Sequence, residues 1–194
     1  MSDVDREILL QQIRIKENLF AEGGNKDFYN KILSNEELFD DEIFVKAQQI
    51  KMFRGKTIPF KLLSNTDTVV KFELKRYMNF VRFVGQTVIH QAFNELHAPD
   101  NTEITRWKVG SSMTPHSDNS WPDGNQLDHP TSFRTWSGIY YINDDYEGGN
   151  LIMFGDKKID TKNGDLIIFP SRSIGAIRDR TVMQLRCPST ELTF

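Results

Sequence analysis

A histidine and a carboxylate stand two residues apart in the segment TPHSDNS at residues 114–120. Side chains two positions apart on a strand point to the same face, so His116 and Asp118 would present an imidazole and a carboxylate together. This is the beginning of a facial triad, in which two histidines and one carboxylate hold iron(II). A His-x-Asp triplet also occurs in polar surface turns, so the surrounding sequence has to decide between a metal site and a turn.

The composition is that of an ordinary soluble globular protein. The 194 residues are 38% hydrophobic and 26% charged, with a formal net charge of -3, which fits one domain with a substantial core. No basic excess indicates nucleic acid as a partner, and no apolar stretch indicates a membrane span. The N-terminal residues do not follow the pattern of a signal peptide, so we expect a cytoplasmic protein.

Cysteine usage limits the kind of metal site that the chain can build. Cys187 is the only cysteine, which excludes an internal disulfide framework and a zinc site with several thiolates. Histidine and carboxylate side chains are the remaining source of metal ligands. Any metal is therefore expected to be bound by nitrogen and oxygen.

The sequence pattern changes near residue 100. Residues 1 to about 97 show apolar residues at helical spacing, for example in residues 41–53 and 66–97. From about residue 102, short segments rich in β-branched and aromatic residues alternate with turn formers. These segments are EITRWKV, TWSGIYYIN, NLIMFG, DLIIFP and TVMQLRC. We predict an α+β fold, with an antiparallel sandwich, barrel or jelly roll over residues 102–194 and the earlier helices packed against one sheet.

Several motifs surround the His-x-Asp pair in a fixed order. Along the chain they are Trp107 and Gly110, His116 and Asp118, Arg134, Tyr141-Ile142-Asn143, Glu147-Gly148-Gly149, Gly164-Asp165 and Phe169-Pro170. In this order and spacing, residues 102–171 resemble the 2-oxoglutarate and iron(II)-dependent oxygenases of the prolyl 4-hydroxylase type. The resemblance implies a double-stranded β-helix (jelly roll, cupin-like) with supporting N-terminal helices, in a single domain spanning residues 1–194.

The same resemblance implies a cofactor set and a reaction. His116 and Asp118 would bind iron(II), and 2-oxoglutarate would be the cosubstrate, with ascorbate as an optional addition. The implied products are succinate, carbon dioxide and a hydroxylated substrate, which would be a peptide side chain or a small molecule. No nucleic acid or membrane partner is expected.

Two aromatic residues are assigned to the cosubstrate pocket on this resemblance. Trp107 stands where relatives carry a tyrosine that contacts the cosubstrate, and a core position is an equally good interpretation. Tyr140 and Tyr141 are adjacent on a predicted strand and therefore face opposite sides, so at most one looks into the barrel. We assign Tyr141 to the pocket.

One ligand that the family pattern requires is missing. In the family a second histidine follows the Phe-Pro strand, and Gly175 occupies that place here. Three explanations are open. In the first, the protein has lost turnover while keeping the fold. In the second, His129 in the long loop of residues 119–133 completes the metal site. In the third, the recorded sequence after about residue 172 is altered. His90 and His97 lie in the predicted helical part and are interpreted as structural or surface residues.

The resemblance also requires a basic residue that binds the far carboxylate of 2-oxoglutarate. Arg186, on a predicted strand eleven residues after Gly175, and Arg180, in the preceding turn, are the candidates. A guanidinium matches a carboxylate in bidentate fashion, and we choose Arg186. Two other functions compete with the oxygenase: a catalytically inactive ligand- or protein-binding domain, and a cupin-like protein that binds zinc or nickel.

Overall fold

The structure is a computed structural model, and it describes residues 2–20, 24–34, 55–59, 69–99, 102–107, 115–121, 125–143, 150–154, 156–173, 175–176 and 181–188. Several features discussed above lie outside these ranges: residues 41–53, Gly110, the Glu147-Gly148-Gly149 turn and Arg180. Among the described residues, no helix is both long and apolar enough to cross a membrane.

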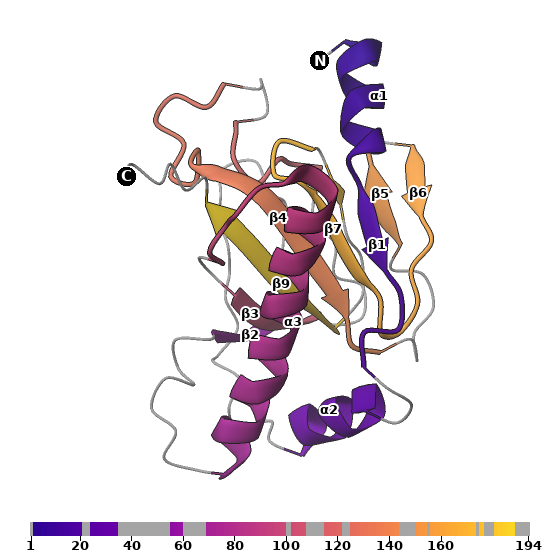
Figure 1. The fold of residues 1–194 in the computed structure, drawn as a ribbon, viewed down its shortest axis with the longest axis vertical. Helices are drawn as coiled ribbons and strands as arrows, with labels where there is room; N and C mark the ends of the chain where they lie inside the picture. Colours follow the sequence, from indigo (N-terminus) through magenta and orange to yellow (C-terminus); the bar gives the residue numbers. More distant parts are fainter. Residues whose placement is uncertain are drawn as a thin grey trace.

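Two antiparallel sheets and three helices make up the described part of the chain (Figure 1). The larger sheet has the strand order β1-β7-β4-β9-β3-β2, and the smaller has the order β6-β5-β8. The helices are α1 (Asp3–Gln11), α2 (Gly24–Leu33) and α3 (Val69–Phe93). The strands are β1 (Arg14–Lys16), β2 (Gly55–Pro59), β3 (Thr102–Trp107), β4 (Arg134–Tyr141), β5 (Leu151–Met153), β6 (Lys157–Ile159), β7 (Leu166–Pro170), β8 (Gly175–Ala176) and β9 (Thr181–Pro188).

Strands β4 and β7 of the large sheet are buried on both faces, because helices cover one side and the small sheet covers the other. Alternate residues of β4 and β7 enter two separate cores. The core shared with α2 and α3 includes Trp136, Tyr140, Leu166 and Ile168. The core shared with β5 and β6 includes Ile139, Tyr141, Ile167 and Phe169. We call the second side the inner face of the large sheet; positions that alternate onto it lie between the sheets.

The helices form where apolar residues recur with the helical period. Along α3 the fully buried side chains include Leu74, Met78 and Val81, which line one face of the helix. Figure 1 shows α3 lying across the large sheet, with α2 at one end of it. Phe28 of α2 is fully buried and stacks on Tyr77 of α3 at 4.6 Å between ring centroids. Truncating such a buried aromatic residue typically costs about 3–5 kcal/mol.

The predicted combination of helices with antiparallel sheets is confirmed. The five predicted strand segments correspond to β3, β4, β5, β7 and β9. Four short strands were not predicted. β1 and β2 lie within the region predicted to be helical yet belong to the large sheet, and β6 lies in a segment read as a turn. β8 has only two residues, too few to show any periodicity.

Candidate active site

His116 and Asp118 lie side by side in the structure. His116 Nε2 is 3.4 Å from Asp118 Oδ1, and the two side chains are 25% and 18% exposed. The segment is not a regular strand, contrary to the geometry from which their common direction was predicted. The two donors nevertheless come together, and their partial exposure leaves them accessible to a small ligand.

Ser137 ties Asp118 to the large sheet. The Ser137 hydroxyl donates a hydrogen bond of 2.6 Å to Asp118 Oδ2. Ser137 alternates with Trp136 along β4 and therefore occupies the inner face together with Ile139. The His-x-Asp pair is thus anchored to the side of the large sheet that faces the small sheet.

Ser171, which follows β7 directly, holds the same segment by its backbone. Its carbonyl oxygen accepts hydrogen bonds from Asp118 N at 2.8 Å and from the Ser117 hydroxyl at 2.9 Å. Its own hydroxyl lies 2.8 Å from the Ser137 hydroxyl. Ser137 and Ser171 are both buried. Sequence reasoning missed them, because an isolated serine in a strand or turn carries no signal.

Strand register places the predicted cosubstrate residues relative to this anchor. Arg186 of β9 pairs with Ser137, and Tyr141 pairs with Val182 of the same strand. Cross-strand partners share a face of the sheet, so position 186 belongs to the inner face. By the same alternation, position 107 at the end of β3 is an inner-face position, because Thr105 pairs with Val182.

Tyr140 and Tyr141 enter different cores, as their adjacency predicted. Tyr140 packs against the helices, and its hydroxyl donates to Asn25 Oδ1 of α2. Burial, followed by the charge of Asp165, raises the pKa of Tyr140 far above its ordinary value. Tyr141 is fully buried in the core between the sheets.

A third protein ligand is not found among the described residues. No group of three His, Cys, Asp or Glu side chains in that part of the chain could hold a metal ion together. Gly175, which we assigned to the place of the second family histidine, lies in β8, where Met153 pairs with Gly175 and Ile152 pairs with Ala176. Glycine and alanine both lack a donor atom in the side chain, so neither residue of β8 can supply the ligand.

His129 comes near the pair without joining it. Its Nδ1 accepts a hydrogen bond from Thr131 N at 3.3 Å, and the Thr131 hydroxyl donates to the Asp118 carbonyl at 2.6 Å. Burial and the neighbouring Arg134 lower the pKa of His129, although the charge of Asp118 opposes this. The imidazole is therefore biased toward the neutral form, but the structure does not group it with His116 and Asp118 as a metal site.

The other two histidines lie elsewhere. His90 is exposed on α3. His97 Nε2 is 2.6 Å from Glu95 Oε2, which also accepts a hydrogen bond of 2.7 Å from Trp136 Nε1. Burial alone would raise the pKa of Glu95, but the hydrogen bonds from Trp136 and His97 outweigh it and lower that pKa. His97 therefore has a structural role in joining the end of α3 to β4.

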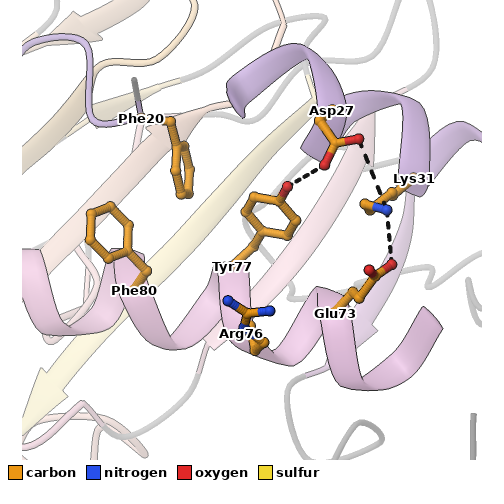
Figure 2. A pocket seen from close by; sticks show the side chains of 7 residues that line it. All are labelled: Phe20, Asp27, Lys31, Glu73, Arg76, Tyr77 and Phe80. Carbon is orange, nitrogen blue, oxygen red and sulfur yellow. Dashed lines mark hydrogen bonds and ion pairs between the residues drawn. The ribbon is translucent and has the colours of Figure 1, made fainter. Parts of the chain in front are cut away.

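A hollow between α2 and α3 is separate from this site (Figure 2). Its volume is about 320 Å³, and its lining residues are Phe20, Asp27, Lys31, Glu73, Arg76, Tyr77 and Phe80. Lys31 Nζ is 2.8 Å from Glu73 Oε2 and 3.9 Å from Asp27 Oδ1, and Tyr77 donates to Asp27. Its two acids are thus already paired within the protein. We interpret the hollow as part of the contact between the two helices.

Comparison with protein families gives a match over the sheet region. The family described as the 2OG-Fe(II) oxygenase superfamily matches residues 102–182, which include His116, Asp118 and the strands β3 to β8. Over residues 102–182 the chain is therefore similar to the 2OG-Fe(II) oxygenase superfamily. The matched oxygenase segment is less than half of the chain. A comparison with curated proteins gives no match.

Solved oxygenase structures share the fold of nearly the whole chain. A prolyl-4-hydroxylase from Pseudomonas putida is 12% identical, with 92% of this chain and 94% of that chain covered and a TM-score of 0.63. A prolyl hydroxylase from Trichoplax adhaerens, in complex with a hypoxia inducible factor peptide fragment, is 17% identical over 94% and 86% of the chains, with a TM-score of 0.67. HygX from Streptomyces hygroscopicus, with nickel, 2-oxoglutarate and hygromycin B bound, is 13% identical over 100% and 89%, with a TM-score of 0.64.

The donors present fit the iron of the oxygenase superfamily in kind but not in number. An imidazole nitrogen and a carboxylate oxygen are donors that iron(II) accepts. Two donors about 2.1 Å from one ion, at right angles, are about 3 Å apart, which is close to the 3.4 Å between His116 Nε2 and Asp118 Oδ1. The pair therefore suits two protein ligands of a facial triad, and the described residues provide no third.

Proposed function

We propose that the chain is a 2-oxoglutarate- and iron(II)-dependent oxygenase that hydroxylates a peptide side chain or a small molecule. The observation that carries this proposal is the pairing of His116 and Asp118 at 3.4 Å, anchored by Ser137 to the inner face of the large sheet. The match to the 2OG-Fe(II) oxygenase superfamily supports it, because the matched residues include this pair.

The finer fold that we propose is a double-stranded β-helix, in which the two sheets form the walls of a jelly roll. The antiparallel pairing supports it, since β4 and β7 lie in the large sheet whereas β5 and β6, which lie between them in the sequence, form the small sheet with β8. Successive strands that alternate between two facing sheets are typical of jelly rolls.

In this proposal, His116 and Asp118 bind the metal through Nε2 and Oδ1. Bound iron(II) with 2-oxoglutarate supplies the oxidative chemistry, which the protein side chains alone do not. The chain provides ligands and their orientation, and the apolar core between the sheets limits the access of water. The core residues nearest in register to the anchor are Ile139 and Phe169.

We assign the far carboxylate of 2-oxoglutarate to Arg186, and the walls of its pocket to Trp107 and Tyr141. Strand register supports this assignment, because Arg186 pairs with Ser137 and positions 107, 141 and 186 all alternate onto the inner face. An arginine guanidinium forms charge-assisted hydrogen bonds with a carboxylate, which are about twice as strong as neutral ones. The complete burial of Tyr141 means that only a ligand reaching into the core could contact it.

The proposed substrate is either a peptide or a small molecule. Among the structures of similar fold, the Trichoplax adhaerens enzyme is in complex with a peptide fragment and HygX is in complex with hygromycin B. The described loop residues 125–133 are mostly exposed and follow Asp118 closely. We propose that this loop borders the substrate entrance.

The test is the addition of iron(II) and 2-oxoglutarate to purified protein without oxygen. A visible charge-transfer absorption that requires both additions is the expected result, followed by release of succinate when oxygen is admitted. Absence of the absorption band at millimolar 2-oxoglutarate would contradict the proposal. A band without succinate release would indicate an inactive ligand-binding domain.

A further inference from the structure

We propose that Ser137 and Ser171 are positioning residues that hold the Asp118 carboxylate in one orientation for metal binding. The inference rests on the proposed function and adds to it two residues that contact neither metal nor cosubstrate. Both serines are at most 2% exposed; Ser137 lies in β4, and Ser171 directly follows β7.

The hydrogen positions follow from the partners. A serine hydroxyl has one hydrogen, whereas a carboxylate oxygen only accepts. The Ser137 hydroxyl donates its hydrogen to Asp118 Oδ2 at 2.6 Å, so its oxygen must accept from the Ser171 hydroxyl at 2.8 Å. The result is a directed chain in which Ser171 donates to Ser137 and Ser137 donates to Asp118.

This chain of hydrogen bonds makes the two carboxylate oxygens of Asp118 different. Oδ2 is turned toward the buried serines, whereas Oδ1 faces His116 Nε2 at 3.4 Å. A metal ion bound beside His116 would therefore meet Oδ1 while Oδ2 stays hydrogen-bonded to the protein. Hydrogen bonds of this kind to a ligating carboxylate fix its direction and typically change metal affinity by about 10- to 100-fold when removed.

Ser171 also fixes where Asp118 stands along the chain. Its carbonyl oxygen accepts from Asp118 N and from the Ser117 hydroxyl, and its backbone N–H donates to Thr135 O of β4 at 2.8 Å. One residue therefore joins the His-x-Asp segment to both β4 and the end of β7. The backbone contacts persist when the Ser171 side chain is truncated, so Ser171→Ala isolates the hydroxyl.

The exclusion of water strengthens the hydrogen bonds that join Ser171, Ser137 and Asp118. Ser137 and Ser171 are buried, and Ser137 lies beside the apolar residues Ile139 and Phe169. A hydrogen bond to a charged group is stronger where water is excluded. Removing one member of a buried hydrogen bond leaves the other member buried and unpaired. This costs more free energy than the loss of a solvent-exposed hydrogen bond. The main loss is therefore expected at Ser137, the only one of the two serines that contacts the carboxylate.

Four variants of the full chain test the proposal: Ser137→Ala, Ser137→Thr, Ser171→Ala and Ser173→Ala. Ser173 is the matched control, because it is a buried serine beside Ser171 whose hydroxyl has no hydrogen-bond partner among the described residues. Manganese(II) affinity is measured by calorimetry, iron(II) affinity without oxygen, and the melting temperature of each metal-free protein separately.

Ser137→Ala is expected to weaken manganese(II) binding by about 10- to 100-fold. Ser137→Thr, which keeps a hydroxyl, should stay within about threefold of the unmodified protein, and Ser173→Ala should not change the affinity. Ser171→Ala should give an intermediate loss of about three- to tenfold, because the Ser137 donor is kept but no longer oriented. The position of the iron(II)–2-oxoglutarate absorption band should shift in Ser137→Ala and not in Ser173→Ala.

Folded Ser137→Ala protein with unchanged metal affinity would overturn the positioning role while leaving the proposed function intact. If Ser137→Ala does not fold, unchanged affinity in Ser171→Ala overturns it instead. Equal losses in Ser171→Ala and Ser173→Ala would do the same, since the effect would then be general loosening. Failure of the unmodified protein to bind manganese(II) or iron(II) would overturn the proposed function and this inference together.

Discussion

Ser137 of β4 and Arg186 of β9 are direct cross-strand partners in the large sheet. The residue that donates to the Asp118 carboxylate, the proposed metal ligand, therefore pairs with the residue proposed to bind the cosubstrate. In an antiparallel sheet such partners have Cβ atoms about 4.5–5.5 Å apart. In the proposed function, the metal site and the cosubstrate site are therefore linked by backbone register.

Replacing Arg186 with alanine is expected to weaken 2-oxoglutarate binding by about 10- to 100-fold, since a hydrogen bond to a charged group contributes about 1.5–3 kcal/mol. Titration of 2-oxoglutarate into the iron(II)-loaded protein without oxygen, followed by its absorption band, measures the change. Manganese(II) affinity should stay the same. Arg180→Ala serves as the comparison, and a loss of affinity in Arg180→Ala alone would transfer the role to that residue.

Removal of either member of the histidine–aspartate pair should abolish stoichiometric metal binding. With two protein donors in the described site, His116→Ala or Asp118→Ala leaves a single donor, and we expect an affinity loss of about 100-fold or more. His90→Ala is the control, because His90 is an exposed histidine on α3 far along the chain from the site. Metal affinity that survives in His116→Ala would show that the pair is not the metal centre.

Gly175→His should raise iron affinity by at least about tenfold, because a second imidazole would join His116 and Asp118 as a third protein donor. Ala176→His is the matched control, since neighbouring residues of a strand point to opposite faces. The iron content of the unmodified protein, measured by metal analysis, tests the same assignment independently. Tight stoichiometric iron that persists in His129→Ala would mean that the assignment of the third position to Gly175 is wrong.

The contact between α2 and α3 should weaken at high pH because of Tyr77 (Figure 2). Burial, together with the hydrogen bond to Asp27, raises the pKa of Tyr77 to about 12, from about 10 in an unfolded chain. A raised folded-state pKa contributes stability that is complete below about pH 10 and is lost as the pH rises through about 12.

Tyr77→Phe should therefore reduce the free energy of unfolding by about 1 kcal/mol at neutral pH, with the difference from the unmodified protein fading between about pH 10 and 12. Denaturant unfolding across this range measures it. The pKa of Lys31 is also raised, chiefly by its hydrogen bond to Glu73, and Lys31 is present in both proteins, so it cancels in the difference. A constant difference across the whole range would contradict the assignment to the Tyr77 hydroxyl.

Much of the large sheet could be predicted because its longer strands are rich in β-branched and aromatic residues and are separated by turn formers. The run from Trp136 to Tyr141 is rich in aromatic residues, which favours a strand, and the adjacency of Tyr140 and Tyr141 predicts that they face opposite sides of the sheet. The structure places them in two different cores. β1 and β6 could not be predicted, because three residues are too few to show a period of two. Their pairing comes from neighbours distant in the sequence, as when Arg14 pairs with Ile168.

Of the residues in the candidate site, only those with a chemically distinctive side chain could be predicted from the sequence. His116 and Asp118 stand out by residue type, and the motifs around them fix their context. Ser137 and Ser171 lie 19 and 53 residues after Asp118 and are of a common residue type, so only the folded chain shows that they meet. The strand geometry used to predict the common direction of His116 and Asp118 is absent, and the hydrogen bonds of Ser171 and Ser137 hold the segment instead.

β1 has a consequence for the behaviour of the chain in solution. It covers the outer edge of β7, whose five residues, LIIFP, are all buried. Without β1, that edge would offer unpaired backbone groups on a run of apolar residues, which is the usual starting point for strand addition between molecules. With β1 in place, the edge that remains belongs to a three-residue strand carrying Arg14 and Lys16, and both its shortness and its charges discourage another chain from extending the sheet. β1 thus protects the edge of β7, the strand that Ser171 follows, from pairing with another molecule.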